Sequence, residues 1–488
     1  MEKFIGILGI ISILGIAFLF SNNRGKINYR LVFSGLGLQL VLALLILKVP
    51  IVTKFFQLLG HGMEKIEEFA REGMMFCFGG VLPNPPALAP IFGGNNAFIF
   101  AFNIPATIIL VCVLVAILYH FGIMQRVVAI IARGVHFIMR ASGAETLSNV
   151  ASAFVGQVEA QVMIRPYLEG MTKSELLTSM AGSMACIAGG ILIVYVNMGV
   201  PAEYLIAASL MAAPASIVIS KIVFPETEVS QTQGSVKVDI KSNYSNVIDA
   251  ISHGASDGMK ISINVIAMLI GFIALIAMMN YILGKISVLC GATTPINLNT
   301  IFGYLFYPLA YVMGVPSADV QTVATFMGQK LTMNEFVAYS NMTGLTHAKT
   351  NFIELIKNAK NVTPAIKQII DHIVSTNTFT YNEASQLIQA KVMDKQTLIS
   401  LIGNKTILFN EGQHTYTLNN PISKKGIAIA SFALCGFANF SSVGIQIGGI
   451  GELAPNRRVD LAKLGLKALL CGTLASYLSA TLAGLLMG

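Results

Sequence analysis

The chain has 488 residues, of which 54% are hydrophobic and 11% are charged, against roughly 25% charged residues in a soluble globular domain. So few charges cannot cover a water-facing surface, which argues against a soluble enzyme. The net charge of +8 is spread over 32 basic and 24 acidic residues without a long basic run, so the pattern of a nucleic-acid-binding protein is excluded.

Eight charge-free segments are long enough to cross a bilayer, since about 17 apolar residues in a helix span the hydrocarbon core. They are Phe4–Asn23, Leu31–Leu47, Ala97–Tyr119, Leu176–Ala202, Tyr204–Ser220, Ile261–Gly284, Gly426–Gly451 and Ala468–Gly488. The first resembles a signal peptide but lacks a small-residue cleavage site, which favours a retained helix. Leu298–Gly314, interrupted by Pro308, is either a ninth span or a helix lying flat.

Two further segments have the composition of amphipathic helices at a membrane surface. Ile51–Ala70 mixes apolar residues with lysines and glutamates, and Met124–Met139 carries Arg126 and Arg133 on an otherwise apolar helix. Charged residues on one face and apolar residues on the other are typical of helices that lie in the interface. We therefore expect both to be interfacial helices.

Two segments are too polar and too short to be full spans. Ala144–Met171 contains Glu145, Glu159 and Arg165, and Asp319–Tyr339 contains Lys330 and Glu335. Each is predicted to be a helical hairpin that enters the bilayer partway and returns, which requires cover from protein or a water-filled cavity.

The two hairpins form part of a predicted internal repeat. Gly156-Gln157 in the first matches Gly328-Gln329 in the second, and each hairpin precedes a span with a small, polar middle, around Cys186 and Cys435. Paired hairpins with paired discontinuous helices point to the binding site of a secondary transporter. A hydrophilic block, His347–Lys425, separates the second hairpin from its span. Within it we predict helices in Phe352–Val374 and Glu383–Ile402 and a strand pair in Thr406–Leu418.

Templates for catalysis or metal binding are nearly absent. There is no nucleophile elbow, phosphate loop or zinc motif, and the six cysteines lack disulfide or metal spacing. Glu159 and Glu335 are the residues that need an explanation, because a carboxylate within a membrane usually faces a polar cavity and serves function. The alternative is that both lie in interfacial water. Vicinal sugar hydroxyls suit a carboxylate, and the amide of Gln157 suits a heterocyclic base.

Five strings, spread from Gly156 to Ser442, resemble the concentrative nucleoside transporter family. They are Gly156-Gln157-Val158-Glu159-Ala160, Ile164-Arg165-Pro166-Tyr167-Leu168, Pro225-Glu226-Thr227-Glu228, Asn334-Glu335-Phe336-Val337-Ala338-Tyr339 and Cys435-Gly436-Phe437-Ala438-Asn439-Phe440-Ser441-Ser442. The resemblance implies an all-α polytopic membrane protein that forms homotrimers. It implies about eight transmembrane helices, two re-entrant hairpins, interfacial helices and an inverted-repeat transport domain, beside the small soluble insertion.

The resemblance also implies a set of substrate-binding residues. Gln157, Val158 and Glu159 would meet the nucleobase, with Ile191 packing against it. Asn334 and Glu335 of the second hairpin, with Asn439 and Ser442 of the seventh span, would bind the ribose, and Phe437 would line the pocket. Val158 stands where the family has threonine, so the preference for purine or pyrimidine bases stays open.

A sodium site is implied between the first hairpin and the fourth span, at Ser152, Val155, Cys186 and Ile187. Ser152 replaces the usual asparagine, and Cys186 replaces a serine or threonine. Sodium prefers oxygen ligands, so the thiol weakens this site. Proton coupling through Glu159 or Glu335 is the competing expectation, and no cofactor besides the coupling ion is expected.

The sequence therefore predicts a cation-coupled importer of nucleosides in the inner (cytoplasmic) membrane of a bacterium, not an enzyme and not a nucleic-acid-binding protein. A passive nucleoside channel and a membrane-embedded hydrolase using Glu159 and Glu335 are the alternatives. The expected organisation is 1–50 for the N-terminal spans, 51–140 for interfacial helices and third span, 141–228 for the first hairpin with fourth and fifth spans, 229–316 for an interfacial helix and sixth span, 317–345 for the second hairpin, 346–425 for the extracytoplasmic insertion and 426–488 for the last two spans.

Overall fold

The computed structural model describes residues 2–80, 82, 99–233, 244–292, 295–346, 348–357, 363–393, 395–403, 406–410, 415–418 and 422–487. The chain divides into two compact units, Met1–Tyr339 with Ala428–Gly488, and Ser340–Ile427. Parts of five predicted elements lie outside the described residues: 97–98 of the third span, 358–362 and 394 of the two helices predicted in the insertion, 411–414 of the strand pair and 488 of the last span.

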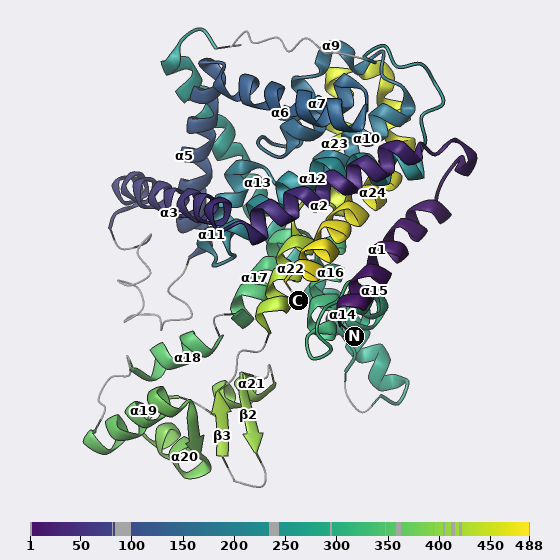
Figure 1. The fold of residues 1–488 in the computed structure, drawn as a ribbon. Helices are drawn as coiled ribbons and strands as arrows, with labels where there is room; N and C mark the ends of the chain where they lie inside the picture. The colour runs from purple at the N-terminus through teal and green to yellow at the C-terminus, as the bar shows by residue number, and fades with distance from the viewer. Residues whose placement is uncertain are drawn as a thin grey trace. The chain divides into compact units, whose positions relative to one another are not determined.

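Helices make up nearly all of the regular structure outside residues 340–427 (Figure 1). In chain order they are α1 (Glu2–Leu19), α2 (Tyr29–Lys48), α3 (Pro50–Phe78), α5 (Phe100–His120), α6 (Ile123–Met139), α7 (Gly143–Ser152), α8 (Glu159–Val162), α9 (Arg165–Leu168), α10 (Lys173–Ala185), α11 (Gly189–Asn197), α12 (Ala202–Val223), α13 (Val247–Leu289), α14 (Leu298–Leu305), α15 (Tyr307–Val312), α16 (Val320–Thr332), α17 (Glu335–Thr346), α22 (Lys424–Leu434), α23 (Phe440–Leu453) and α24 (Arg458–Leu486). Two short 3-10 helices, η1 (Arg24–Lys26) and η3 (Pro455–Arg457), precede α2 and α24.

Three helices of the described chain are long and apolar enough to cross a membrane by length and composition. They are α2, α12 and the stretch Pro455–Leu486 that contains α24. The segments Ile104–His120 and Ile123–Met139 pass the same test only together, and they are bent by 77° relative to each other. Helices α1 and α13 lie at two other predicted spans, with shorter apolar helical stretches at Ile5–Leu19 and Ile273–Leu289.

The surface of these helices is unlike that of a soluble protein. Large apolar side chains lie more than half exposed on several of them: Ile11, Phe33, Phe76, Phe137, Ile263 and Leu289. Exposed apolar surface spread over many helices marks contact with another apolar phase. Lipid chains can cover such side chains, as expected for a polytopic membrane protein.

The two predicted spans with polar middles are both broken. Residues 186–188 separate α10 from α11, and residues 435–439 separate α22 from α23. Gly436 has φ +103°, a left-handed conformation that glycine adopts without steric cost. The polar and glycine-rich sequence in the middle of each span therefore corresponds to an interruption in the helix.

The two interruptions lie against each other. A Cβ atom on Gly436 would lie 2.4 Å from the carbonyl oxygen of Ala185, so only glycine fits there. The Cys186 sulfur lies 3.8 Å from the carbonyl oxygen of Ser209 on α12, and the Ser209 hydroxyl lies 3.7 Å from the Cys435 sulfur. All six cysteines are free thiols.

Helices α2, α12 and α24 pack together, and α10 packs against both α12 and α24 (Figure 1). A second pair, α5 and α13, makes extensive contact away from this group. Helix α13 has 43 residues, which at 1.5 Å per residue is about 65 Å, longer than the hydrocarbon core. Its N-terminal part carries Asp249, Asp257 and Lys260, while the segment from Ile261 is apolar.

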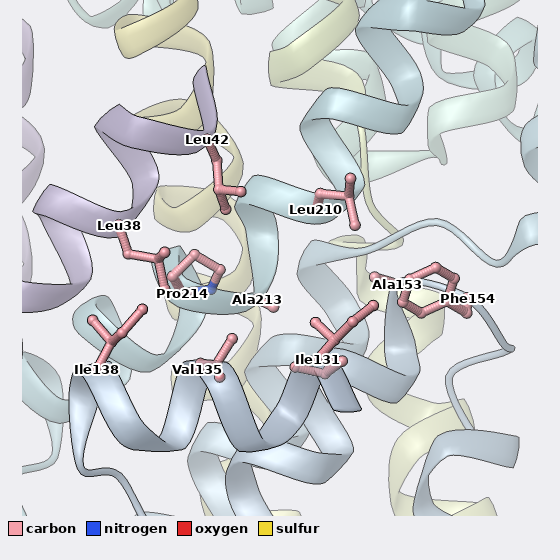
Figure 2. A pocket seen from close by; sticks show the side chains of 12 residues that line it. Leu38, Leu42, Ile131, Val135, Ile138, Ala153, Phe154, Leu210, Ala213 and Pro214 are labelled. Atoms are coloured by element: carbon pink, nitrogen blue, oxygen red, sulfur yellow. The ribbon is translucent and has the colours of Figure 1, made fainter. Parts of the chain in front are cut away.

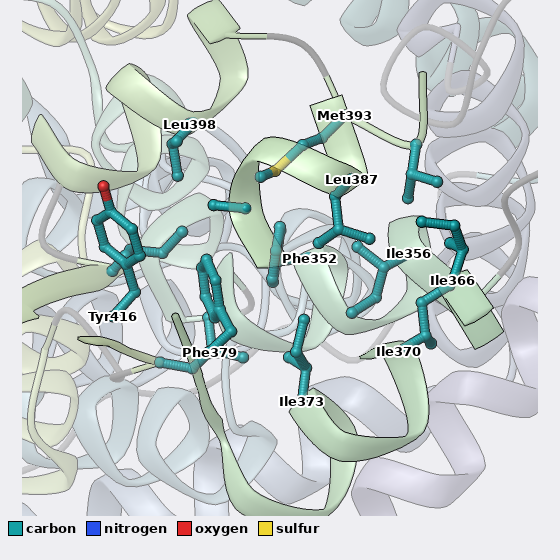
Figure 3. Packing of buried hydrophobic residues seen from close by; sticks show 14 residues of the cluster. Phe352, Ile356, Ile366, Ile370, Ile373, Phe379, Leu387, Met393, Leu398 and Tyr416 are labelled. Carbon is teal, nitrogen blue, oxygen red and sulfur yellow. The ribbon is translucent and has the colours of Figure 1, made fainter. Parts of the chain in front are cut away.

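The second unit contains α18 (Ala348–Lys357), α19 (Pro364–Thr376), α20 (Tyr381–Gln389), α21 (Lys395–Gly403) and the strands β1 (Thr378–Thr380), β2 (Ile407–Asn410) and β3 (Thr415–Leu418). The predicted pairing of the last two strands is confirmed: both neighbours in the order β1-β3-β2 are antiparallel. Strand β1 was not predicted, because its three residues are too few to show a strand pattern. Figure 3 shows the core, in which Phe379 stacks between Phe352 and Tyr416.

Candidate functional site

A buried ion pair fixes the start of the first helix–turn–helix segment, residues 143–168. Ser142 and Glu145 form a capping box at the N-terminus of α7. The other oxygen of Glu145 lies 2.8 Å from Lys221 Nζ on α12, and Glu226 lies 3.1 Å from the same nitrogen. Removing one partner of the buried Glu145–Lys221 pair would leave an uncompensated charge, so the pair fixes where α7 lies against α12.

The turn between α7 and α8 carries two of the predicted site residues, Gln157 and Val158, and a third, Glu159, is the first residue of α8. A Cβ atom on Gly156 would lie 1.9 Å from Glu159 Oε2, so the carboxylate folds back over a glycine that cannot be replaced without moving it. Glu159 itself is exposed. The structure therefore does not enclose this carboxylate in the way that it encloses Glu335.

Both neighbours of Glu159 in the turn contact α23. Gln446 Nε2 donates to the carbonyl oxygen and to the side-chain oxygen of Gln157, at 3.2 Å each. The methyl groups of Val158 lie against Gly449, where a Cβ atom would be 2.7 Å from Val158 Cγ2. The turn of the first segment thus rests on the middle of α23.

The second segment, residues 320–339, places Glu335 at the first position of α17. Asn334 accepts the backbone N–H of Val337 at 3.0 Å and so caps this helix. Glu335 is 5% exposed. Tyr195 on α11 donates its hydroxyl to Glu335 Oε1 at 2.9 Å, and Asn439 donates its amide to Oε2 at 3.0 Å. A buried carboxylate that accepts a charge-assisted hydrogen bond on each of its two oxygens is held in one orientation.

One face of α23 joins the two segments. Asn439 contacts the second segment, and Gln446, seven residues later, contacts the first. Ser442 lies between them on the same face at three- and four-residue spacing, and its side chain is buried. Seven residues of helix rise about 10 Å. Polar groups from both segments are therefore about 10 Å apart along one helix, a length that a base linked to a sugar can bridge.

The structure places Ile191 on α11 and Phe437 in the interruption before α23. Ile191 packs against an apolar cluster that includes Ile104, and Phe336, the residue after Glu335, packs against the same cluster. Phe437, in the interruption before α23, is half-buried, and its carbonyl oxygen accepts the N–H of Asn439 at 2.9 Å.

The four residues of the predicted sodium site come from two segments that touch. Gly189 donates its N–H to the carbonyl oxygen of Phe154 at 3.3 Å, which joins the turn after Ser152 to the interruption that contains Cys186 and Ile187. Ser152 Oγ lies 2.8 Å from the Ser148 carbonyl oxygen and 3.0 Å from Ser183 Oγ. The sulfur of Cys186 instead lies against Ser209 on α12.

Ser152 and Ser183 belong to a larger buried cluster of uncharged oxygen-bearing side chains. Gln161 donates to Ser148 and Ser183 and accepts from Ser179, at distances between 2.6 and 3.1 Å. The oxygen atoms of this cluster are hard ligands, unlike the thiol of Cys186. Among the described residues, no group of three or more His, Cys, Asp or Glu side chains could hold a metal ion.

An apolar cavity of about 220 Å³ lies between α2, α6, α7 and α12 (Figure 2). Its walls are aliphatic side chains such as Leu38, Ile131 and Pro214, with Phe154 at one end. A nucleoside would leave its hydroxyl and amide groups unpaired there, at a cost of several kcal/mol. This cavity is therefore not the candidate site.

Two residues of the α23 face and its surroundings were not predicted. Gln446 has the helical spacing from Asn439 that could have identified it. Tyr195 lies one helical turn after Ile191, but a tyrosine in an apolar run carries no signal of a polar contact across 140 positions of sequence.

Three protein-family models match the chain. The model described as the C-terminus of Na+ dependent nucleoside transporters matches residues 204–370 and 385–484, and the corresponding N-terminal model matches residues 8–81. A model described as nucleoside recognition matches residues 101–202. Together these models cover both segments and α23.

Similar whole chains are transporters. The chain is 37% identical to the uncharacterized transporter YutK of Bacillus subtilis, with 98% of each chain covered. It is 32% identical to nucleoside permease NupC of Helicobacter pylori, over 99% of this chain and 97% of the relative. It is also 32% identical to sodium/nucleoside cotransporter 2 of Rattus norvegicus, over 99% of this chain and 63% of the relative.

The fold is similar to that of CNTnw solved in an inward-facing substrate-bound state. The TM-score is 0.80 at 34% identity, and the match covers 100% of this chain and 98% of the other. These are transporters and not enzymes. The chain belongs to the Na+-dependent nucleoside transporter family, the concentrative nucleoside transporters, and is a membrane protein.

Proposed function

We propose that this protein imports nucleosides across the bacterial cytoplasmic membrane in symport with sodium. The observation that carries the proposal is the shared face of α23, which has the Glu335–Asn439 pair at one end and the Gln157–Gln446 pair at the other. These groups suit the two halves of a nucleoside. The names of NupC and the mammalian cotransporter agree with such a substrate.

At the sugar end, Glu335 is the acceptor for the vicinal hydroxyls of ribose, with Asn439 and Ser442 beside it. The carboxylate has two oxygens with several lone pairs, so it accepts from a sugar while keeping its bond to Tyr195. Asn334 holds this carboxylate in place through its cap on α17. Phe437 and Ile191 supply the apolar walls.

At the base end, the turn of the first segment provides amide groups. Gln446 Oε1 is buried and has no hydrogen-bond partner among the described residues, while its nitrogen donates to Gln157. A buried acceptor without a partner costs about 1–3 kcal/mol. An N–H group of a nucleobase would pair with this oxygen, and Gln157, Val158 and Glu159 would surround the rest of the ring.

In this proposal residues 143–168 and 320–339 are re-entrant hairpins, and they move with α10–α11 and α22–α23 as the transport domain of each protomer in a homotrimer. The cation binds at Ser152, Val155, Cys186 and Ile187 and orders the first hairpin against the interruption between α10 and α11. One charge crossing ~100 mV supplies ~2.3 kcal/mol, which is more than tenfold accumulation.

Proton coupling is the second candidate. It is favoured by the poor ligand quality of the Cys186 sulfur, which lies against Ser209, and by the exposure of Glu159 at the surface of the protomer. In that case Glu159 would carry the proton while the hairpin is loaded.

Uptake of labelled uridine and adenosine into proteoliposomes tests the proposal, with sodium and proton gradients imposed separately at the same membrane potential. Accumulation above the external concentration that needs the sodium gradient is expected. Accumulation driven only by the proton gradient would replace sodium by protons. Equilibration without accumulation would make the protein a passive channel, and no uptake of either nucleoside would refute the function.

A further inference from the structure

Lys330 is the most deeply buried lysine of the described chain that has no carboxylate partner. It lies on α16, its side chain is fully buried, and it is not part of the sugar or base contacts described above. Its ammonium nitrogen lies 2.9 Å from the carbonyl oxygen of Ala433, 2.9 Å from that of Cys435, and 3.2 Å from Ser476 Oγ. The first two oxygens belong to the last turn of α22 and the interruption that follows it.

All three partners act as hydrogen-bond acceptors. The two carbonyl oxygens can only accept, and Ser476 donates its own proton to the Cys435 carbonyl oxygen at 2.7 Å. Nζ must therefore donate three hydrogen bonds. A neutral amine has only two N–H groups, whereas an ammonium has three, so the geometry selects the charged form.

The Lys330 ammonium lies at the C-terminus of α22, where a positive charge is favourable. The C-terminus of α22 ends in carbonyl groups without partners in the helix and carries the negative end of the helix dipole, which a cation stabilises. The N-terminus of α23 carries the positive end, and Asn439 joins it to the carboxylate of Glu335. The second segment thus supplies a cation to one helix half through Lys330 and an anion to the other through Glu335.

The first segment meets the other helix break through its backbone. The carbonyl oxygen of Phe154 accepts the N–H of Gly189, at the start of α11, at 3.3 Å. The proposed sodium site, with Ser152 and Val155 on one side and Cys186 and Ile187 on the other, lies beside this contact.

We propose that Lys330 is a positioning residue that serves as a built-in cation. Its ammonium joins the second segment to the α22–α23 break, as a free monovalent cation would join the first segment to the α10–α11 break. The second segment is therefore closed on α23 without an ion from solution, so that Glu335 is already in place when the nucleoside arrives. This inference rests on the proposed function.

Chemical rescue in proteoliposomes tests it. Lys330→Ala removes the ammonium and leaves room for a small amine, so uridine uptake should fall about ten- to hundredfold, as expected for lost hydrogen bonds to a charged group. Propylammonium chloride should restore uptake. Equal concentrations of 1-propanol, which fills space without charge, and of tetramethylammonium, which has no N–H group, should not. Lys260→Ala, at an exposed lysine on α13, is the control and should behave like the wild type.

Lys330→Met separates charge from packing, because it keeps the volume of the side chain and removes the ammonium. Uridine uptake by this variant should fall by the same factor as in Lys330→Ala. Uptake at the wild-type level in either variant would overturn the proposal, as would rescue of Lys330→Ala by 1-propanol as effectively as by propylammonium. A variant that does not fold and is not restored to the wild-type melting temperature by propylammonium would also overturn it. Absence of uridine uptake by the wild type would instead refute the proposed function.

Discussion

Asn439 uses both ends of its side-chain amide to join two parts of the protein. Its oxygen accepts the backbone N–H of Ser442 at 2.9 Å and caps α23, and its nitrogen donates to Glu335 at 3.0 Å. The cap fixes which end of the amide faces the carboxylate, since the oxygen must face the helix. The orientation of the Glu335 carboxylate is therefore built into the N-terminus of α23.

Two substitutions at Asn439 should separate these functions. Asn439→Ser keeps a good N-cap but loses the donor to Glu335, so we expect normal folding and an increase in the KM for uridine of about ten- to hundredfold. Asn439→Asp keeps the cap but faces Glu335 with a second carboxylate, and we expect a larger loss. The measurement is uridine uptake with melting temperature in detergent as the folding control. An unchanged KM in both variants would mean that this amide does not set the position of Glu335.

Gln446 should act on the base and not on the sugar. Gln446→Leu removes two hydrogen bonds to Gln157 and the buried oxygen that we assign to a base N–H. Neutral hydrogen bonds contribute about 0.5–1.5 kcal/mol each, so the affinity should fall roughly three- to tenfold. Competition of uridine uptake by unlabelled nucleosides measures this change. The relative affinities of different bases should shift, and identical ratios in variant and wild type would contradict the assignment.

Gly436 should tolerate no side chain. Gly436→Ala combines a positive φ with a Cβ atom 2.4 Å from the Ala185 carbonyl oxygen, so the two interruptions cannot keep their contact. Strain of this kind costs about 1–3 kcal/mol before any clash is counted. We expect a lower melting temperature and little uptake. Gly444→Ala is the matched control, because nothing lies within 4 Å of its Cβ position in the same region, and it should be at least as stable as the wild type. Equal stability of both variants would count against the close contact.

Cys186→Ser tests the coupling site. A hydroxyl is a harder ligand than a thiol, so the sodium concentration that gives half-maximal uptake should fall several-fold if Cys186 faces the ion during transport. Cys471→Ser, in a buried part of α24, is the control and should leave the sodium dependence unchanged. If neither variant changes the sodium dependence, this side chain is not a ligand and proton coupling becomes the better account.

Much of this architecture could be predicted because the sequence pattern is local. Charge-free runs indicated α2, α12 and α24, and the polar middles around Cys186 and Cys435 indicated the interrupted helices. Asn334 and Asn439 stand directly before helices, where asparagine is a common cap. Glu335 stood out because a carboxylate in an apolar segment needs a partner.

The remaining features depend on contacts between distant segments. Tyr195 and Glu335 are 140 positions apart, and Lys330 meets carbonyl groups that any residue could supply. From the sequence alone, a lysine near a hairpin turn is expected to be solvated, and only the fold shows that it contacts the C-terminus of α22. The sequence left open whether Glu159 is enclosed or exposed, because the outcome depends on how the turn folds back over Gly156.

The central claim is that Glu335 holds the sugar hydroxyls of a nucleoside. Equilibrium binding to the purified protein, comparing uridine with 2′,3′-dideoxyuridine in the wild type and in Glu335→Gln, tests it most directly, with Glu452→Gln on the exposed side of α23 as the control. The wild type and the control should bind uridine about ten- to hundredfold more tightly than the dideoxy compound, because hydrogen bonds to a charged group are lost with the hydroxyls. In Glu335→Gln this preference should largely disappear. A preference of the same size in Glu335→Gln would contradict the account.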